Sequence, residues 1–476
     1  MAAFRKKIVL INPPLSLHER YGSLKAAGNS LPNLGLCYLA AVAIEQGWDV
    51  KIIDCPALQI TIPNLVQMIG HEMPGIVGIT ASTPAIFNAH SSMKIIKKTY
   101  PDMLTLIGGP HISSIPRAFQ ELDSFDIAVL GEGELTLKDI LDYAEGKKDL
   151  EQIDGIAYRI NGVISFTQSR APITNIDMLP FPAWDLLQRL NKFYRPSLQC
   201  VKQLPATILV TSRGCPYRCA FCDHSVFGYN IRYHGCKYVI DMIKYLFSKY
   251  RIKEFAIHDE CLFTVKERAI DFLNAIVKER LKISWTVQAR VDQVDIQLLT
   301  LLKKTGCWQI QLGIESGSER ILKILNKDIS KDQIFRVCRL IKEVGLSLKG
   351  FFMLGNPGET EDTIQETFDL ALQLPLDDFQ CTFFTPYPGC RLYKEVGRWG
   401  TLDNVNFSEM NQYNIVFLPF GLSKSILKKE FKNGYRRFYL RPRIILNYLK
   451  RMREPSLWNS YVKGIMGFIK FSLLPS

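Results

Sequence analysis

Short runs of β-branched residues alternate with helix-like segments in two stretches of the chain, and this alternation limits the possible folds more than any other feature. In residues 6 to about 145, five such runs end in Gly, Asn, Asp or Thr. They read KIVLIN, DVKIID, IVGIT, LTLIGG and IAVLGEG. This order predicts an α/β fold with a doubly wound, Rossmann-like parallel sheet whose ligands lie at the carboxyl ends of the strands.

The alternation resumes at Thr207 and continues through six further strand-like runs, each followed by a helix-like stretch. The runs are TILVTSRGC, EFAIHDE, SWTVQARV, IQLGIESG, LKGFFMLG and FQCTFFTPYPG. Six such units predict an open or partial (βα)6 barrel, in which the loops after the strands build the active site.

A chain of 476 residues is too long for one typical core, so we expect several domains. A hairpin-like piece, GIAYRINGVISF, and a Pro-rich connector, LPFPAWDLL, separate the two arrays. The expected parts are a Rossmann-like domain over residues 1–145, a linker over 146–205, a partial barrel over 206–395, and a small, mostly helical C-terminal region over 396–476.

The N-terminal MAAFRKKIVLINPPL is too briefly apolar for a secretory signal, because Pro13 and Pro14 interrupt it. No segment offers the roughly 20 uninterrupted apolar residues of a membrane-spanning helix. These features predict a cytoplasmic protein. A reducing compartment disfavours disulfides, so the twelve cysteines need another explanation, and metal binding is the first.

Three cysteines, Cys215, Cys219 and Cys222, fall within eight residues directly after a strand-like run. Three thiolates on a [4Fe–4S] cluster leave the fourth iron open to the amino and carboxylate groups of a small molecule. Phe221 presents an aromatic face suited to a purine. The alternatives are a three-cysteine zinc loop that lacks a partner and a chance cluster of buried thiols.

At these residues the chain resembles the radical S-adenosylmethionine (SAM) superfamily, whose hallmark is a Cys-x3-Cys-x2-Cys loop after the first barrel strand. The resemblance implies that this cluster binds and cleaves SAM. Later strand ends resemble the family's other SAM contacts. Arg290 would pair with the SAM carboxylate and Glu315 would accept from the ribose hydroxyls. The full set of implied SAM contacts is Phe221, Asp259, Gln288, Arg290, Glu315 and Ser316.

The N-terminal domain resembles the cobalamin-binding domain that precedes the barrel in one branch of this superfamily. Glycines at strand ends let the backbone approach a corrin or its nucleotide tail, and hydroxyls can reach its amide groups. The implied cobalamin contacts are Pro13, Leu34, Gly35, Ser82, Thr83, Gly108, Gly109, Gly131, Glu132 and Gly133. The alternatives are a generic nucleotide-binding fold and a degenerate domain that holds no ligand.

One departure from the family concerns the cobalt. Many cobalamin domains carry Asp-x-His-x-x-Gly, in which the histidine ligates cobalt, and residues 1–145 contain no such motif. His18 and His111 are the nearest candidates, and neither has the spacing. We therefore expect cobalamin to bind with no protein histidine on the cobalt.

The resemblance implies a cobalamin-dependent methyltransferase: a 5′-deoxyadenosyl radical takes a hydrogen atom from an unactivated carbon, which then receives a methyl group from methylcobalamin. The alternative is an oxidative cyclase of the anaerobic magnesium-protoporphyrin IX monomethyl ester cyclase type. A non-catalytic cobalamin-binding sensor is a third hypothesis. Cys390 is a candidate hydrogen donor facing the substrate, although free cysteines more often serve packing. An electron donor such as flavodoxin or ferredoxin is also expected.

Basic residues concentrate at the end of the chain. From Gly421 onward there are thirteen Lys or Arg and two Glu, which is +11 of the net +13. A nucleic-acid binder would spread basic residues over a core face, so we expect no nucleic-acid partner. The tail interleaves basic and apolar residues, which favours either peripheral contact with an anionic membrane or a helical cap on the barrel. Membrane contact would favour a lipid, isoprenoid or porphyrin-like small-molecule substrate.

Overall fold

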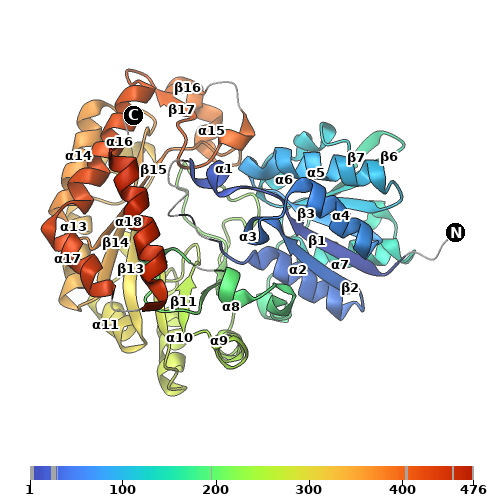
Figure 1. Ribbon diagram of the computed structural model, residues 1–476, viewed down its shortest axis with the longest axis horizontal. Helices are drawn as coiled ribbons and strands as arrows, with labels where there is room; N and C mark the ends of the chain where they lie inside the picture. The colour runs from blue at the N-terminus through green and yellow to red at the C-terminus, as the bar shows by residue number, and fades with distance from the viewer. Residues whose placement is uncertain are drawn as a thin grey trace.

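The computed structural model describes residues 5–22, 28, 30–194, 196–402, 406–452 and 455–473. Figure 1 shows two α/β units side by side, the first in blue to cyan and the second in green to orange. The last helices, in red, lie on the outside of the second unit. We call the two units the N-terminal domain and the barrel.

The N-terminal domain is built on a seven-stranded sheet with strand order β2-β1-β3-β4-β5-β6-β7. Its parallel strands are β1 (Lys7–Asn12), β2 (Asp49–Asp54), β3 (Ile76–Thr80), β4 (Leu104–Gly108) and β5 (Ile127–Val129). The helices are α1 (Leu17–Tyr21), α2 (Leu34–Glu45), α3 (Cys55–Leu58), α4 (Ile62–Glu72), α5 (Ile86–Thr99), α6 (Pro110–Ser114) and α7 (Glu134–Ala144). The predicted doubly wound sheet is confirmed.

The hairpin β6 (Ile156–Ile160) and β7 (Val163–Phe166) adds two antiparallel strands to the edge of this sheet. The sheet therefore continues past residue 145 into the stretch that we predicted as a linker. Backbone pairing between β5 and β6 explains this extension, because an edge strand offers unpaired peptide groups to any neighbouring strand.

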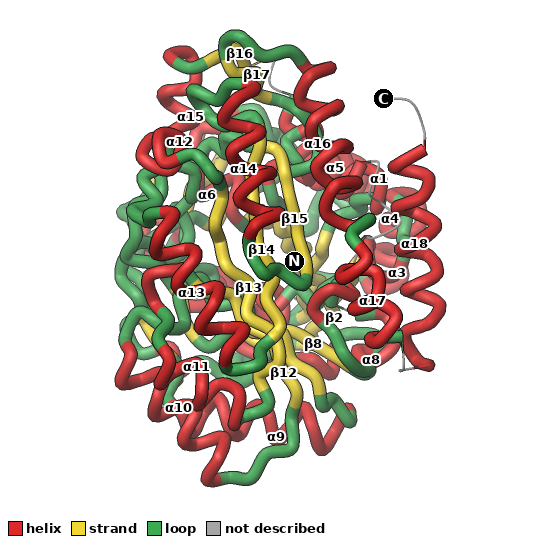
Figure 2. The backbone as a smooth tube through the Cα atoms, turned by 90° about the vertical axis from the view of Figure 1, so that its left-hand side faces the viewer, coloured by secondary structure: helices red, strands yellow, loops and turns green. Residues whose placement is uncertain are grey.

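The barrel is a six-stranded parallel sheet with strand order β15-β14-β13-β12-β11-β8. Its strands are β8 (Ala206–Leu209), β11 (Glu254–Ile257), β12 (Ser284–Ala289), β13 (Cys307–Glu315), β14 (Ser347–Leu354) and β15 (Asp378–Phe383). Figure 2 shows helices covering the outer side of this sheet. They are α9 (Cys236–Tyr250), α10 (Lys266–Lys278), α11 (Ile296–Lys304), α12 (Glu319–Ile324), α13 (Lys331–Glu343) and α14 (Glu361–Gln373). The partial (βα)6 barrel is confirmed.

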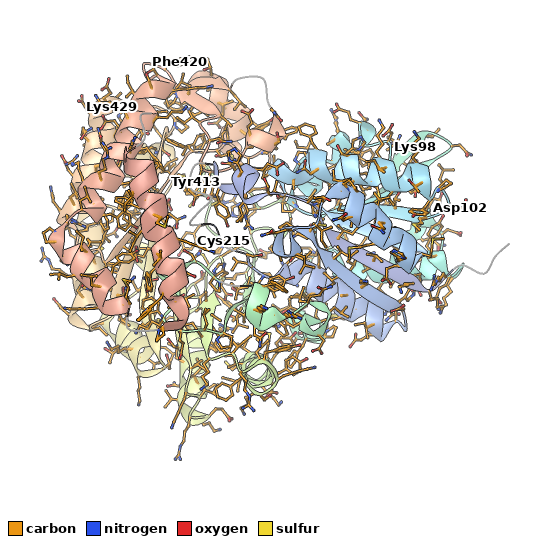
Figure 3. The ribbon with its side chains drawn as sticks, in the orientation of Figure 1. Lys98, Asp102, Cys215, Tyr413, Phe420 and Lys429 are labelled. Carbon is orange, nitrogen blue, oxygen red and sulfur yellow. The ribbon has the colours of Figure 1, made fainter. Side chains whose placement is uncertain are left out.

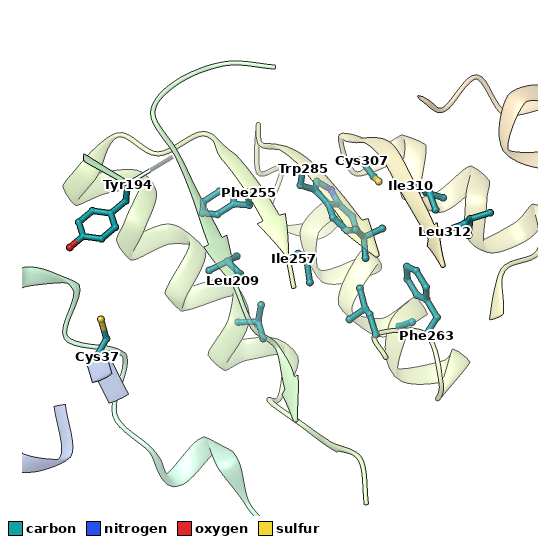
Figure 4. Close-up of a cluster of buried hydrophobic side chains, with 14 of the residues drawn as sticks. Cys37, Tyr194, Leu209, Phe255, Ile257, Phe263, Trp285, Cys307, Ile310 and Leu312 are labelled. Carbon is teal, nitrogen blue, oxygen red and sulfur yellow. The ribbon is translucent and has the colours of Figure 1, made fainter. Parts of the chain in front are cut away.

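One hydrophobic cluster runs without a break from the first domain into the barrel. The connecting segment, which includes α8 (Leu190–Phe193), buries Trp184 and Tyr194 completely within this cluster. Figure 4 shows Tyr194 and Cys37 of α2 at one end of the cluster, and Phe255 and Trp285 of the barrel further along it. The segment therefore packs the two domains together rather than spacing them apart.

The C-terminal region starts with α15 (Arg391–Glu395) and the strand pair β16 (Gly400–Leu402) and β17 (Phe417–Pro419), followed by three helices. These are α16 (Lys424–Tyr439), α17 (Pro442–Arg451) and α18 (Trp458–Leu473). Tyr435 packs on Phe379 of β15, whereas Tyr461 joins a cluster with Ala206 of β8. Because β8 and β15 are the two edges of the sheet, these helices bridge its open side. Among the described residues, no helix combines the length and hydrophobicity needed to cross a membrane.

Candidate active site

The three-cysteine loop follows the short strand β9 (Ser212–Arg213), which pairs with β10 (Arg232–Tyr233) beyond the end of β8. Figure 3 places Cys215 at the centre of the molecule, between the N-terminal domain and the barrel. The loop thus occupies the carboxyl end of a barrel strand, where the fold was expected to carry its chemistry.

The surroundings of the loop favour the thiolate form at Cys215 and Cys219, whereas the hydrogen bond with Cys219 and burial raise the pKa of Cys222. A hydrogen bond with Cys261, whose Sγ lies 3.3 Å from Cys215 Sγ, lowers the pKa of Cys215 to about 4. A hydrogen bond with Cys222 and the positive charges of Lys327 and Arg290 lower the pKa of Cys219 to about 6. Thiolates are the form that binds iron–sulfur clusters, so Cys215 and Cys219 already favour the form that a cluster needs, and Cys222 would lose its proton on binding.

The loop is not arranged for a single ion. Among the described residues, no three His, Cys, Asp or Glu side chains converge as ligands of one metal ion do.

Arg290 follows β12 and lies against the cysteine loop, as its predicted role requires. Its Nη1 is 3.4 Å from Cys219 Sγ, and its guanidinium carbon lies 3.7 Å from the centre of the Tyr217 ring. Asp292 and the backbone oxygen of Lys327 accept its remaining hydrogen bonds. These contacts orient the guanidinium beside the loop. The carboxylate that pairs with it in the structure is that of Asp292, whereas the prediction pairs it with the SAM carboxylate.

Glu315 ends β13 in the left-handed region, with a φ of +67°, which is costly for a residue with a side chain. Its Oε1 accepts from Lys327 Nζ at 2.8 Å. Lys327 in turn lies 5.7 Å from the centre of the Phe221 ring. Three of the predicted SAM contacts, Arg290, Glu315 and Phe221, are therefore brought to one side of the cysteine loop, with Lys327 between them.

Two other predicted SAM contacts make hydrogen bonds to neighbouring elements of the fold. Both oxygens of the fully buried Asp259 accept hydrogen bonds from Thr211 and Ser212, at 2.5 to 2.8 Å, so this carboxylate braces the end of β8. The buried Ser316 hydroxyl lies 3.2 Å from Thr367 Oγ1 of α14. For these residues a SAM contact is an untested prediction with a structural alternative in view.

Gln288 behaves differently from its neighbours. It lies on β12, between β11 and β13, yet its side chain is exposed. Solvent therefore reaches the barrel sheet at this position, and a ligand there can contact the Gln288 side chain.

The predicted cobalamin contacts gather at the carboxyl edge of the first sheet, because β1, β3, β4 and β5 are adjacent and parallel. They follow these strands or start α2, and Ser82 is exposed. Gly109 has a φ of +106°, and a Cβ there would lie 2.7 Å from Thr80 Oγ1, so only glycine fits. A glycine-lined strand edge of this kind fits a corrin. The set comprises Pro13, Leu34, Gly35, Ser82, Thr83, Gly108, Gly109, Gly131, Glu132 and Gly133.

The two histidines of this domain occupy different places. His111 is buried, its Nδ1 lies 3.3 Å from Thr83 Oγ1, and burial lowers its pKa to about 4. Its ring also packs edge-on against Phe407 of the C-terminal region. His18 is exposed and lies near the backbone oxygen of Gly22. The absence of a protein ligand on cobalt stays a prediction.

A buried ion network that the sequence reasoning missed joins the two domains. Glu132 accepts from Arg213 Nη1 at 3.0 Å and from Arg232 Nη1 at 2.7 Å, and Glu134 accepts from Arg213 Nη2 at 2.6 Å. Each of the four side chains is at most 9% exposed. Glu132 therefore pairs with the barrel in this structure, where we predicted a cobalamin contact.

Two further contacts of the cysteine loop were also missed. Ser114, at the end of α6, donates to Asp223, the residue after Cys222. Arg213 lies two residues before Cys215, so the N-terminal domain holds the loop at both ends. Cys261 reaches Cys215 from the end of β11, although its sequence position shows no ligand spacing. Contacts of this kind join residues far apart in the chain, so no local sequence pattern predicts them.

Cys390, the predicted hydrogen donor, is buried at the start of α15 among apolar side chains that include Ala220 and Phe384. Burial raises the pKa of its thiol to about 11. This placement is consistent with a packing role, and hydrogen donation by Cys390 stays a prediction.

Comparisons with known proteins agree with this architecture. Residues 209–371 match the radical SAM superfamily, and residues 23–141 match the B12 binding domain. The chain is 34% identical over 442 residues to an uncharacterized methyltransferase of Pyrococcus horikoshii, covering 92% of this chain and 94% of the relative. It is 30% identical over 439 residues to the anaerobic magnesium-protoporphyrin IX monomethyl ester cyclase of Rubrivivax gelatinosus, covering 90% and 77%.

A solved structure shows the same fold. The cobalamin-dependent S-adenosylmethionine radical enzyme OxsB, with aqua-cobalamin bound, superimposes with a TM-score of 0.72 at 18% sequence identity. The superposition covers 98% of this chain and 72% of that one. At this level of identity the likeness concerns the arrangement of the two domains.

Proposed function

The chain belongs to the radical SAM superfamily, in the branch with an N-terminal B12-binding domain, and from this premise we propose that it methylates an unactivated carbon of a small-molecule substrate. The family's cofactors are a [4Fe–4S] cluster, SAM and cobalamin, which when bound supply the radical and the methyl group. The 34% identity to a methyltransferase over nearly the full length of both chains supports methyl transfer.

The observation that carries the proposal is the attachment of the cysteine loop to the strand ends of the N-terminal domain. Arg213 and Asp223, on either side of the loop, bond to Glu132, Glu134 and Ser114. A methyl group can be passed on only to a carbon held close to it and in line. A rigid contact between the radical site and the cobalamin edge meets this requirement.

In this proposal the chain contributes placement. Cys215, Cys219 and Cys222 hold the cluster, and Arg290 orients the SAM carboxylate through its planar guanidinium. Tyr217 and Asp292 fix the Arg290 side chain, because they cover its face and its Nε edge. The buried pair of Lys327 and Glu315 closes the side of the loop and keeps water from it.

Two partly exposed apolar side chains of β14 support an apolar substrate. Phe351 and Met353 of β14 are partly exposed, whereas Phe352 and Leu354 between and after them are buried against the helices. Met353 belongs to the cluster that also contains Phe221. A lipid, isoprenoid or porphyrin-like substrate fits this lining, and a porphyrin ester is named for one relative. A small redox protein such as flavodoxin or ferredoxin is the proposed electron donor.

Ring closure of the cyclase type is the second candidate, supported by 30% identity over 90% of the chain. The two functions differ in what becomes of SAM. Anaerobically reconstituted protein, supplied with cobalamin, reductant and SAM, is assayed by mass spectrometry with porphyrin and isoprenoid substrates. Methyl transfer predicts both 5′-deoxyadenosine and S-adenosylhomocysteine, and a product heavier by one methylene. Deoxyadenosine with an unmethylated product would refute methyl transfer in favour of the cyclase.

A further inference from the structure

An exposed apolar surface runs along the last two helices. On α18 the exposed residues recur every three or four positions, which places them on one helical face. On α17 three exposed residues share a face in the same way. We call this surface the outer stripe: Leu440, Ile445, Leu446, Leu449, Trp458, Val462, Ile465, Met466 and Ile469, each between 44% and 59% exposed.

The opposite faces of both helices are anchored, so the outer stripe is held outward. The Tyr448 hydroxyl and Arg451 donate to the fully buried Asp378 of β15, each at 2.7 Å. On α18, Tyr461 is only 3% exposed and packs against Tyr448. Figures 1 and 2 show the two helices next to one another on the outside of the barrel. The tail therefore caps the barrel, but it keeps an apolar face in solvent.

The outer stripe concentrates exposed hydrophobic area. Of the 22 large hydrophobic side chains exposed among the described residues, nine belong to it. Scattered single residues of this kind are ordinary, whereas a contiguous set marks a surface that another body covers.

The charge around the outer stripe identifies the kind of body. From Leu440 to the end, the sequence has seven Lys or Arg and one Glu. Lys450 and Lys463 are exposed on the same two helices. A second copy of the chain would bring equal positive charge against this surface. Nucleic acid would leave the nine exposed apolar side chains without apolar contacts. Apolar residues with a Trp and a rim of lysines match the boundary of an anionic bilayer.

We propose that the outer stripe docks the enzyme on an anionic lipid surface. The apolar side chains enter the boundary between headgroups and acyl chains, while Lys450 and Lys463 pair with lipid phosphates. Docking of this kind needs no spanning helix. It is independent of the methyl-transfer proposal, because it rests on the C-terminal helices alone.

The test is flotation of the full, anaerobically reconstituted chain with phosphatidylcholine vesicles, with and without phosphatidylglycerol. We expect binding to the anionic vesicles, weakened by added salt. A variant with Leu446→Gln, Leu449→Gln, Val462→Gln and Ile465→Gln should lose at least about tenfold in partitioning into the anionic vesicles, because four apolar side chains no longer enter the bilayer boundary. Lys450→Gln and Lys463→Gln should each cost about fivefold.

The control replaces two exposed apolar residues of the N-terminal domain, Val163→Gln and Phe166→Gln, which are 67% and 47% exposed, and should bind as the unmodified chain does. Circular dichroism and urea unfolding establish that each variant is folded. Equal binding to neutral and anionic vesicles would overturn the proposal, as would an unaffected quadruple variant. A dimer that the quadruple variant dissociates would also overturn it, by making the outer stripe an interface between copies.

Discussion

Replacing Glu132 by Gln removes one charge from the ion network that joins the two domains. The Glu132 carboxylate accepts from Arg213 at 3.0 Å, Arg232 at 2.7 Å and the Ile173 backbone nitrogen at 2.8 Å. The Gln side chain has nearly the same shape as Glu, but the two buried guanidiniums of Arg213 and Arg232 are left with Glu134 as the one carboxylate of the network. Loss of one partner in a buried pair costs about 3–5 kcal/mol. Because Gln still accepts hydrogen bonds, we expect a loss of about 3 kcal/mol in the free energy of unfolding.

Urea unfolding followed by circular dichroism measures this loss. The control is Glu279→Gln, whose partner Lys244 and own side chain are 45% and 40% exposed, and which should lose less than about 1 kcal/mol. In the E132Q variant the ratio of S-adenosylhomocysteine to 5′-deoxyadenosine should also fall, because Arg213 no longer fixes the loop against the cobalamin edge. A variant that matches the control in both stability and product ratio would refute this account of the domain contact.

Three further predictions concern the packing of α16, the pH dependence of stability, and Cys261, which contacts the cysteine loop. A Cβ at Gly434 of α16 would lie 1.8 Å from Phe368, so Gly434→Ala should cost about 1–3 kcal/mol in urea unfolding despite the better helix propensity of Ala. Burial lowers the pKa of His111 and His234 to about 4. Their contribution to the free energy of unfolding is therefore present above pH 6.5 and is lost as the pH falls towards 4. At pH 5 each histidine should have lost about 2 kcal/mol of this contribution. Cys261→Ala should retain its iron, because three thiolates already complete the protein ligands.

Each of these has a contrary outcome. Gly397 has open space around its Cβ position, so Gly397→Ala is the packing control, and equal stability of the two variants would contradict the close approach. Replacing both histidines by Gln should flatten the fall in stability between pH 6.5 and 5; an unchanged slope would count against the buried neutral imidazoles. Iron loss in Cys261→Ala, measured against Cys381→Ala, would make Cys261 a ligand.

The sequence was sufficient for the fold because periodicity reports local structure. The β-branched runs at β1, β3 and β8 lie where the structure has strands, and the cysteine loop follows its strand as expected. The hairpin β6–β7 was assigned to a linker, because two short strands do not reveal which sheet they join.

The site was less predictable wherever a role depends on a distant partner. Asp259, a predicted SAM contact, accepts a hydrogen bond from Thr211, and Glu132, a predicted cobalamin contact, pairs with Arg213 across the domains. Asp259 is 48 positions from Thr211, and Glu132 is 81 positions from Arg213. Pairs this far apart produce no periodic pattern in the sequence. Cys261 is a similar case, since only the parallel packing of β11 beside β8 brings it to the loop.

The most direct test of the central claim is the iron content and electron paramagnetic resonance spectrum of anaerobically reconstituted protein, recorded with and without SAM. The account predicts about four irons per chain and a reduced-cluster signal that shifts when SAM is added, because SAM chelates the open iron. The Cys219→Ala variant should lose both the signal and all SAM cleavage. A variant that keeps the cluster, or a signal indifferent to SAM, would contradict the assignment of Cys215, Cys219 and Cys222 as the ligands of a SAM-binding cluster.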